Sequence, residues 1–139
     1  MTSVTPTSDS LVHRIDTNGV ATITLNRPHV LNALSPQLFI DLRSLIEQIR
    51  VDTENVGVVI LRGEGRAFSA GNDLGSIAKG EQAPSQYFQS ETIDELENLP
   101  QPVIASVKGA CYTGALELML AADLVIASQS AIFCDTHAP

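Results

Sequence analysis

The chain has 139 residues, of which 44% are hydrophobic and 17% are charged, a composition typical of one folded domain with a substantial core. Eight Lys and Arg against sixteen Asp and Glu give a formal net charge of -8, which argues against non-specific binding to nucleic acid or anionic membranes. No apolar run approaches the roughly 18 residues of a membrane-spanning helix, and the polar start is unlike a signal peptide, so we expect a cytoplasmic protein with neither kind of partner.

The first elements that the sequence predicts are a hairpin and a helix. Asn18-Gly19 lies between two β-rich segments and supplies the positive φ angles of a tight hairpin turn. Ser35 is a suitable N-cap before Pro36, and apolar residues then recur at helical spacing to about Arg50. We expect a flexible tail over residues 1–10 and a folded core over residues 11–139.

Buried strands and helices alternate along the rest of the chain. Short apolar runs rich in β-branched residues predict buried strands, and longer amphipathic segments predict helices. The expected order is a strand ending at Gly63, a helix from Pro84 to about Leu99, a strand over Val103–Val107, a helix in "TGALELMLAA", a strand in "DLVIAS" and a strand-like "AIFCDTHAP". This order predicts an α/β fold.

A single carboxylate, Glu117, stands in the apolar run "TGALELMLAA", where we expect it to be buried among Leu and Met side chains. If Thr113 is the N-cap, the N–H of Gly114 is unpaired at the positive end of the helix, on the same face as Glu117. An unshielded N–H beside a carboxylate suits stabilisation of an oxyanion together with proton transfer. The alternative is a Glu117 that reaches solvent or pairs with an arginine.

A second glycine junction occurs in "AFSAGNDL", where Ala70-Gly71 ends a strand-like segment and Asn72-Asp73 can begin a helix. We expect a free backbone N–H at Ala70, and two converging N–H groups polarise a carbonyl better than one. The alternative is an ordinary strand-to-helix loop. The neighbouring glycines match neither the dinucleotide nor the Walker A phosphate-binding pattern.

Four segments in this order resemble the crotonase, or enoyl-CoA hydratase/isomerase, superfamily: "LNRPHVLNALS", "GRAFSAGNDL", "PVIASVKGACYTGALELMLAADLVIAS" and "AIFCDTH". The resemblance implies a crotonase-like spiral of repeated ββα units, usually assembled as homotrimers or hexamers. It also implies acyl-CoA thioester substrates whose enolate is stabilised by two backbone N–H groups. Coenzyme A would enter only as part of the substrate, and neither a permanently bound cofactor nor a metal is expected.

The resemblance also assigns roles to individual residues. It places the two N–H groups at Ala70 and Gly114 and the first catalytic carboxylate at Glu117. His137 stands where hydratases have a second catalytic glutamate, so His137 or Asp135 could donate the second proton, although a structural His137 is the alternative. The expected CoA-binding set is Arg27, His29, Val30, Leu31, Ala70, Gly71, Asn72 and Asp73.

Family members are longer than this chain, which resembles their N-terminal part, truncated before the C-terminal helices that cover the acyl pocket. We therefore expect exposed apolar surface and self-association. The leading interpretation is hydration of 2-enoyl-CoA to 3-hydroxyacyl-CoA in fatty-acid or related acyl-CoA metabolism. The alternatives are double-bond isomerisation or another enolate reaction, and a non-catalytic remnant that binds acyl-CoA.

Overall fold

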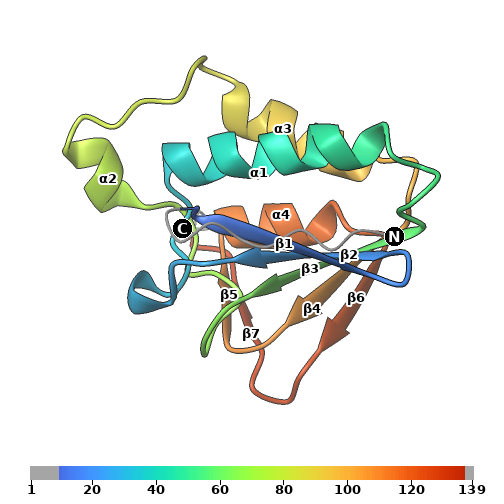
Figure 1. The fold of residues 1–139 in the computed structure, drawn as a ribbon. Coiled ribbons are helices and arrows are strands. Elements are labelled where there is room, and N and C mark those ends of the chain that lie inside the picture. The colour runs from blue at the N-terminus through green and yellow to red at the C-terminus, as the bar shows by residue number, and fades with distance from the viewer. Residues whose placement is uncertain (1–9, 137–139) are drawn as a thin grey trace.

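The computed structural model describes residues 10–136, and its centre is a five-stranded sheet with helices on one face (Figure 1). The sheet order is β1-β2-β3-β4-β6; β1 and β2 are antiparallel, and the other neighbours are parallel. Its strands are β1 (Val12–Thr17), β2 (Val20–Leu25), β3 (Val58–Gly63), β4 (Val103–Val107) and β6 (Leu124–Ala127). The predicted α/β class is therefore confirmed.

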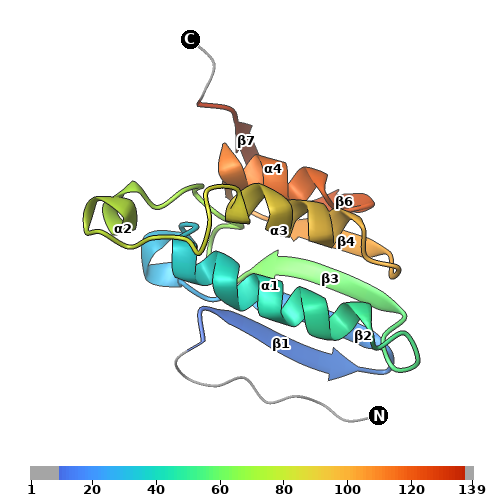
Figure 2. The same ribbon diagram turned by 90° about the horizontal axis from the view of Figure 1, so that it is seen from above.

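Three helices cover the sheet: α1 (Pro36–Arg50), α3 (Phe88–Glu97) and α4 (Gly114–Leu120). Seen from above, α1 and α3 run side by side, and α4 lies beyond α3 on the side of β4 and β6 (Figure 2). Two short helices, η1 (Pro28–Val30) and α2 (Leu74–Ala78), belong to the connections.

A second, smaller sheet pairs β5 (Ala110–Tyr112) with β7 (Ile132–Cys134) in parallel. A bridge between Ser69 and Cys111 extends this pairing to the segment after β3. In the later part of the chain, β4 and β6 belong to the main sheet, and the strands that follow them, β5 and β7, belong to the second sheet. The strands β4 and β5 and the helix α4 form a complete ββα unit. This arrangement confirms the expected spiral of repeated units.

The predicted starts of the first elements are confirmed. Asn18 and Gly19 have φ angles of 52° and 83° in the turn between β1 and β2. Ser35 is the N-cap of α1, where its side chain accepts a hydrogen bond from the Leu38 N–H at 3.1 Å, and Pro36 is the first helical residue.

The helix α3 and the strand β5 differ from the prediction. The helix expected from Pro84 begins at Phe88, because the preceding residues form a turn in which the Phe88 N–H donates to the Ser85 carbonyl. The three-residue strand β5 was not expected, since only Lys108 and Gly109 separate it from β4. Gly109, with φ of 58°, turns the chain from one sheet to the other.

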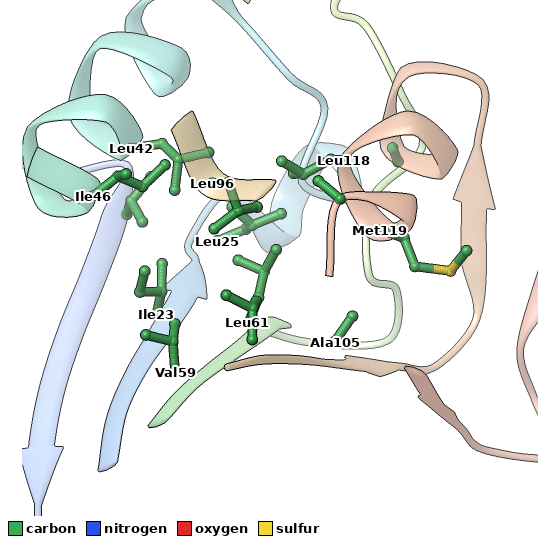
Figure 3. Packing of buried hydrophobic residues seen from close by; sticks show 14 of the residues in the cluster. Ile23, Leu25, Leu42, Ile46, Val59, Leu61, Leu96, Ala105, Leu118 and Met119 are labelled. Carbon is green, nitrogen blue, oxygen red and sulfur yellow. The ribbon is translucent and has the colours of Figure 1, made fainter. Parts of the chain in front are cut away.

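The apolar core lies between the main sheet and the helices (Figure 3). It includes Ile23, Leu25, Leu61 and Ala105 of the sheet, Leu42 and Ile46 of α1, Leu96 of α3, and Leu118 and Met119 of α4. The apolar face of α4 thus packs on the core, and the opposite face, which carries the exposed Glu117, is turned away from it.

The edge strand β6 has all four of its residues exposed, including Leu124 at 62% and Ile126 at 64%. The expectation of exposed apolar surface is therefore confirmed. Within residues 10–136, no helix is both long enough and apolar enough to cross a membrane.

Candidate functional site

The loop after β3 lies against the junction of β5 and α4, as the glycine pattern suggested. The Ser69 N–H donates to the Ala110 carbonyl at 3.0 Å, and the Tyr112 N–H donates to the Ser69 carbonyl at 3.2 Å. At Gly71, with φ of 94°, a Cβ would stand 2.7 Å from the Tyr112 carbonyl oxygen. Only glycine permits this close approach of the two backbones.

Helix α4 begins at Gly114, as predicted, although Thr113 does not cap it with its side chain. Thr113 has φ of 50°, and its hydroxyl lies 2.8 Å from that of Thr136 instead. Among residues 10–136, no acceptor is paired with the Gly114 N–H. This donor is therefore available at the helix start, where the helix dipole favours negative charge.

The second free donor is not at Ala70, and that expectation was wrong. The Ala70 N–H donates to the Leu31 carbonyl at 2.9 Å, and the Gly71 N–H donates to the Ser69 hydroxyl at 3.1 Å. The Asp73 N–H donates to the Leu34 carbonyl. Of these four successive residues, only Asn72 has an N–H that is unpaired within the described part of the chain.

Asn72 lies directly beside Gly114. A Cβ built on Gly114 would stand 2.5 Å from Asn72 Oδ1 and 3.4 Å from Gln89 Nε2. The two N–H groups without an acceptor in the described part of the chain thus belong to neighbouring residues on two separate segments. Sequence reasoning singled out the right loop but chose the wrong residue as the donor.

Glu117 is exposed, so the expectation of a buried carboxylate was wrong. The core side of α4 is occupied by Ala115, Leu118 and Met119, and Glu117 faces α3 instead. It lines a cavity of about 390 Å³ together with Gln86, Gln89, Ser90, Ile93 and Asp94. Within residues 10–136, its carboxylate has no hydrogen-bond or ion-pair partner, which leaves it able to accept a proton.

A neighbouring cavity, also of about 390 Å³, extends from Asn72 toward α1 and α2. Its apolar wall includes Leu34, Phe39, Ile77 and Phe88. Both cavities are lined by Gln86, just before α3, and by Gln89, in its first turn, so they share these two side chains. A third cavity of about 370 Å³ is lined by Ala70, Asn72, Leu74, Tyr112, Thr113 and Thr136.

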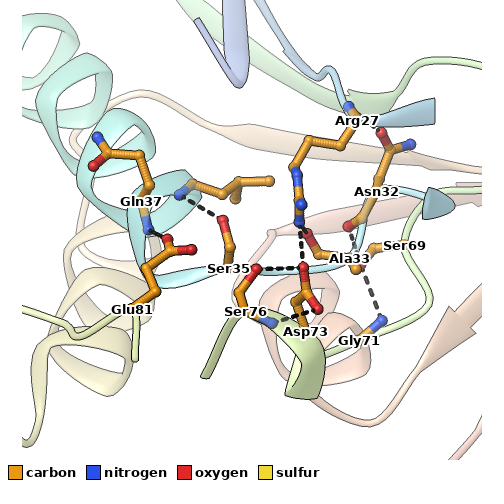
Figure 4. A network of polar contacts seen from close by, with 11 residues as sticks. Arg27, Asn32, Ala33, Ser35, Gln37, Ser69, Gly71, Asp73, Ser76 and Glu81 are labelled. Atoms are coloured by element: carbon orange, nitrogen blue, oxygen red, sulfur yellow. Dashed lines mark hydrogen bonds and ion pairs between the residues drawn. The ribbon is translucent and has the colours of Figure 1, made fainter. Parts of the chain in front are cut away.

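Arg27 and Asp73, both expected to contact CoA, are bound to each other (Figure 4). Arg27 Nη1 donates to Asp73 Oδ2 at 2.9 Å and to the Ala33 carbonyl at 2.6 Å. Ser76 donates to the Asp73 carboxylate through its hydroxyl and its N–H, and these bonds, together with the Arg27 charge, lower the pKa of Asp73 to about 2. This network fixes the loop that carries Asn72.

The segment that includes η1 is open to a ligand at two of its expected positions. His29 and Val30 are exposed, whereas Leu31 is partly buried and its carbonyl accepts from the Ala70 N–H. Asp135 is exposed, and His137 lies outside the described residues. Their contributions to CoA binding and proton transfer remain predictions.

Asn32 was missed by the sequence reasoning. It is fully buried, and its Nδ2 donates to the carbonyls of Glu64 and Ala67 at 2.9 and 3.0 Å. Its Oδ1 accepts from the Arg27 N–H at 2.7 Å. Nδ2 thereby ties the segment of η1 to the loop after β3, while Oδ1 is paired within its own segment, so both polar atoms of this buried side chain have partners.

Comparison with known proteins places this chain in a family. The model of the enoyl-CoA hydratase/isomerase family matches residues 16–138. The chain is 36% identical over 132 residues to the probable peroxisomal enoyl-CoA hydratase 1 of Arabidopsis thaliana, covering 94% of this chain and 49% of the relative. It is 34% identical over 122 residues to the 1,2-epoxyphenylacetyl-CoA isomerase of Escherichia coli, covering 83% and 46%.

Solved structures of enoyl-CoA hydratases/isomerases have the same fold as this chain over most of its length. An enoyl-CoA hydratase/isomerase from Xanthobacter autotrophicus superposes with a TM-score of 0.84 at 36% identity, over 91% of this chain and 49% of that one. The chain spans about half the length of the relatives that it matches. On sequence and fold, the chain belongs to the enoyl-CoA hydratase/isomerase, or crotonase, family.

Proposed function

We propose that the chain acts on acyl-CoA thioesters and adds water across the double bond of 2-enoyl-CoA. The observation that carries this proposal is that, within residues 10–136, the N–H groups of the neighbouring Asn72 and Gly114 have no acceptor, and the carboxylate of Glu117, one turn after Gly114 in α4, has no partner. Asn72 replaces Ala70 as the second donor of the site. Coenzyme A would be bound only as part of the thioester substrate.

The proposed reaction follows from this arrangement. The thioester oxygen accepts hydrogen bonds from the two N–H groups, which polarise the conjugated double bond. Glu117 takes a proton from water as the oxygen of that water bonds to C3, and the electron pair of the double bond moves toward the thioester oxygen. An acid then protonates C2 of the enolate, which gives 3-hydroxyacyl-CoA. Asp135 and His137 remain the candidates for that acid.

Isomerisation is the second candidate, because it needs only one proton-transferring group. Glu117 has no ion-pair partner among residues 10–136 and could remove a proton from one carbon of a 3-enoyl-CoA and return it to another. The position expected for a second glutamate is His137. This departure favours a reaction that a single carboxylate can perform.

The CoA moiety is proposed to lie along η1, where His29 and Val30 are exposed. A protonated imidazole at His29 would suit an anionic phosphate. A homotrimer or hexamer and a cytoplasmic location are further proposals that follow from the family resemblance and from the sequence.

The test is to incubate the chain with 2-enoyl-CoA and, separately, with 3-enoyl-CoA in deuterated water, and to identify the products by NMR. Formation of 3-hydroxyacyl-CoA with deuterium at C2 is the expected result. Conversion of 3-enoyl-CoA without hydration would establish the isomerase instead. Binding of both thioesters without any product would identify a non-catalytic acyl-CoA-binding protein.

A further inference from the structure

Gln89 joins α3 to the loop that carries Asn72. Its Nε2 donates to Asn72 Oδ1 at 3.1 Å, and we call this hydrogen bond the Gln89–Asn72 bridge. The bridge lies over Gly114, where a Cβ would stand 2.5 Å from Asn72 Oδ1 and 3.4 Å from Gln89 Nε2. Two carboxamides therefore adjoin the N–H that is proposed to hold the thioester oxygen.

The bridge also lies where the two cavities of about 390 Å³ meet. One cavity is lined by Glu117, and the other has the apolar wall formed by Leu34, Phe39 and Phe88. Gln89 lines both of them, and Asn72 lines the apolar one. Both side chains adjoin Gly114 and line the apolar cavity, so a substrate with its thioester beside Gly114 would enter that cavity past them.

The backbone of α3 is held in place by α1. The Arg43 guanidinium stacks over the Phe88 ring at 4.0 Å, and its Nε donates to the Thr92 hydroxyl at 3.0 Å. The Phe88 and Thr92 side chains are buried. Because these contacts hold the backbone of α3, we expect the bridge to open by rotation of the Gln89 side chain.

We propose that the Gln89–Asn72 bridge limits the length of the acyl chain that the site accepts. Short acyl groups bind in the Glu117 cavity with the bridge intact, whereas longer chains must break it to enter the apolar cavity. Each cavity alone is near the lower end of the roughly 300–1,000 Å³ typical of ligand pockets, and together they would hold a longer chain. The inference rests on the proposed binding of acyl-CoA.

The test is isothermal titration calorimetry with saturated, unreactive acyl-CoA thioesters from butanoyl to dodecanoyl. Each methylene that enters an apolar cavity should tighten binding by about four-fold. For the parent chain we expect the affinity to stop rising after the short acyl groups. For Gln89→Ala we expect it to keep rising, with decanoyl-CoA bound at least about 10-fold more tightly than by the parent.

Two further variants separate the bridge from general changes to the cavity wall. Gln89→Met keeps the side-chain length but lacks the hydrogen-bond donor. For this variant, too, the affinity should keep rising with the length of the acyl chain. Gln86→Ala is the matched control, because Gln86 lines both cavities but does not take part in the bridge. For Gln86→Ala, as for the parent, the affinity should stop rising after the short acyl groups.

The proposal is overturned if the parent's affinity rises with chain length as steeply as that of Gln89→Ala. It is also overturned if Gln89→Met behaves like the parent or if Gln86→Ala behaves like Gln89→Ala. In each of these cases, acyl-CoA binding itself stands. If neither the parent nor any variant binds any thioester, the proposed function fails together with the length limit.

Discussion

Gly114 lies against the side chain of Asn72 so closely that a single methyl group on Gly114 would stand 2.5 Å from Asn72 Oδ1. Because glycine has no side chain, residue 114 cannot shield its own N–H from a ligand. We predict that Gly114→Ala lowers kcat/KM for a 2-enoyl-CoA by about 100-fold or more, because the methyl group displaces Asn72 from beside one oxyanion donor. Steady-state kinetics provides the measurement.

Gly57→Ala is the matched control for this prediction. A Cβ at Gly57 would make only an ordinary contact of 3.8 Å, with the Gly19 carbonyl. It should leave kcat/KM within a few-fold of the parent value, and thermal melts should show both variants folded. A folded Gly114→Ala with parental kinetics would contradict the role given to this N–H.

Asp73 should contribute to stability in a pH-dependent way. Its pKa falls from the ordinary 3.8 to about 2, chiefly because the Ser76 hydroxyl donates to the carboxylate. Since the pKa is lowered in the folded state, the stabilisation is complete above about pH 4 and is lost as the pH falls toward 2. Asp73→Asn should lower the free energy of unfolding by about 1–2 kcal/mol at pH 7 and by much less near pH 2.

Urea denaturation across this pH range measures the difference. Asp94→Asn is the control, because within residues 10–136 the Asp94 carboxylate has no hydrogen-bond or ion-pair partner. A deficit of Asp73→Asn that stays constant down to pH 2 would show that the carboxylate charge is not responsible.

Local signals explain why much of the fold could be predicted. Ser35 and Pro36 fix the start of α1 through interactions within one turn, so the sequence alone contains the information. The strand β5 was not found because only two residues separate it from β4, and it exists only through pairing with β7 and Ser69.

The donor at Asn72 could not be predicted for a different reason. The four N–H groups from Ala70 to Asp73 do not follow a local pattern, because Gly71 has a positive φ angle and its N–H donates to the Ser69 hydroxyl. The partners of Ala70 and Asp73 are the carbonyls of Leu31 and Leu34, more than thirty residues away in the sequence. Tertiary pairing alone decides which N–H remains available.

The exposure of Glu117 was also beyond local reasoning. Its neighbours in the sequence are apolar, but helical geometry directs Ala115, Leu118 and Met119 to the core and Glu117 toward α3. A seven-residue helix can thus hold a carboxylate between leucines without burying it.

The exposed edge of the main sheet should make the chain self-associate. Leu124 and Ile126 are 62% and 64% exposed on β6, whose outer edge is also free for pairing among the described strands. We predict an average mass that rises with protein concentration, and a smaller rise for the double variant Leu124→Thr with Ile126→Thr. Threonine keeps the strand propensity while it removes apolar surface.

Sedimentation velocity at several protein concentrations provides the comparison. Val51→Thr is the control, since Val51 is 80% exposed at the end of α1, away from this strand. A parent chain that stays monomeric at every concentration, or a double variant that associates as strongly as the parent, would refute this prediction.

The most direct test of the proposed site is hydration of crotonyl-CoA by the chain and by its Glu117→Gln variant, followed through the loss of the enoyl-thioester absorbance. The variant keeps the size of the side chain but lacks the carboxylate that accepts the proton. We predict measurable turnover by the parent and a rate at least about 100-fold lower in the variant. Equal turnover by both proteins would contradict the role of Glu117 and, with it, the proposed hydration.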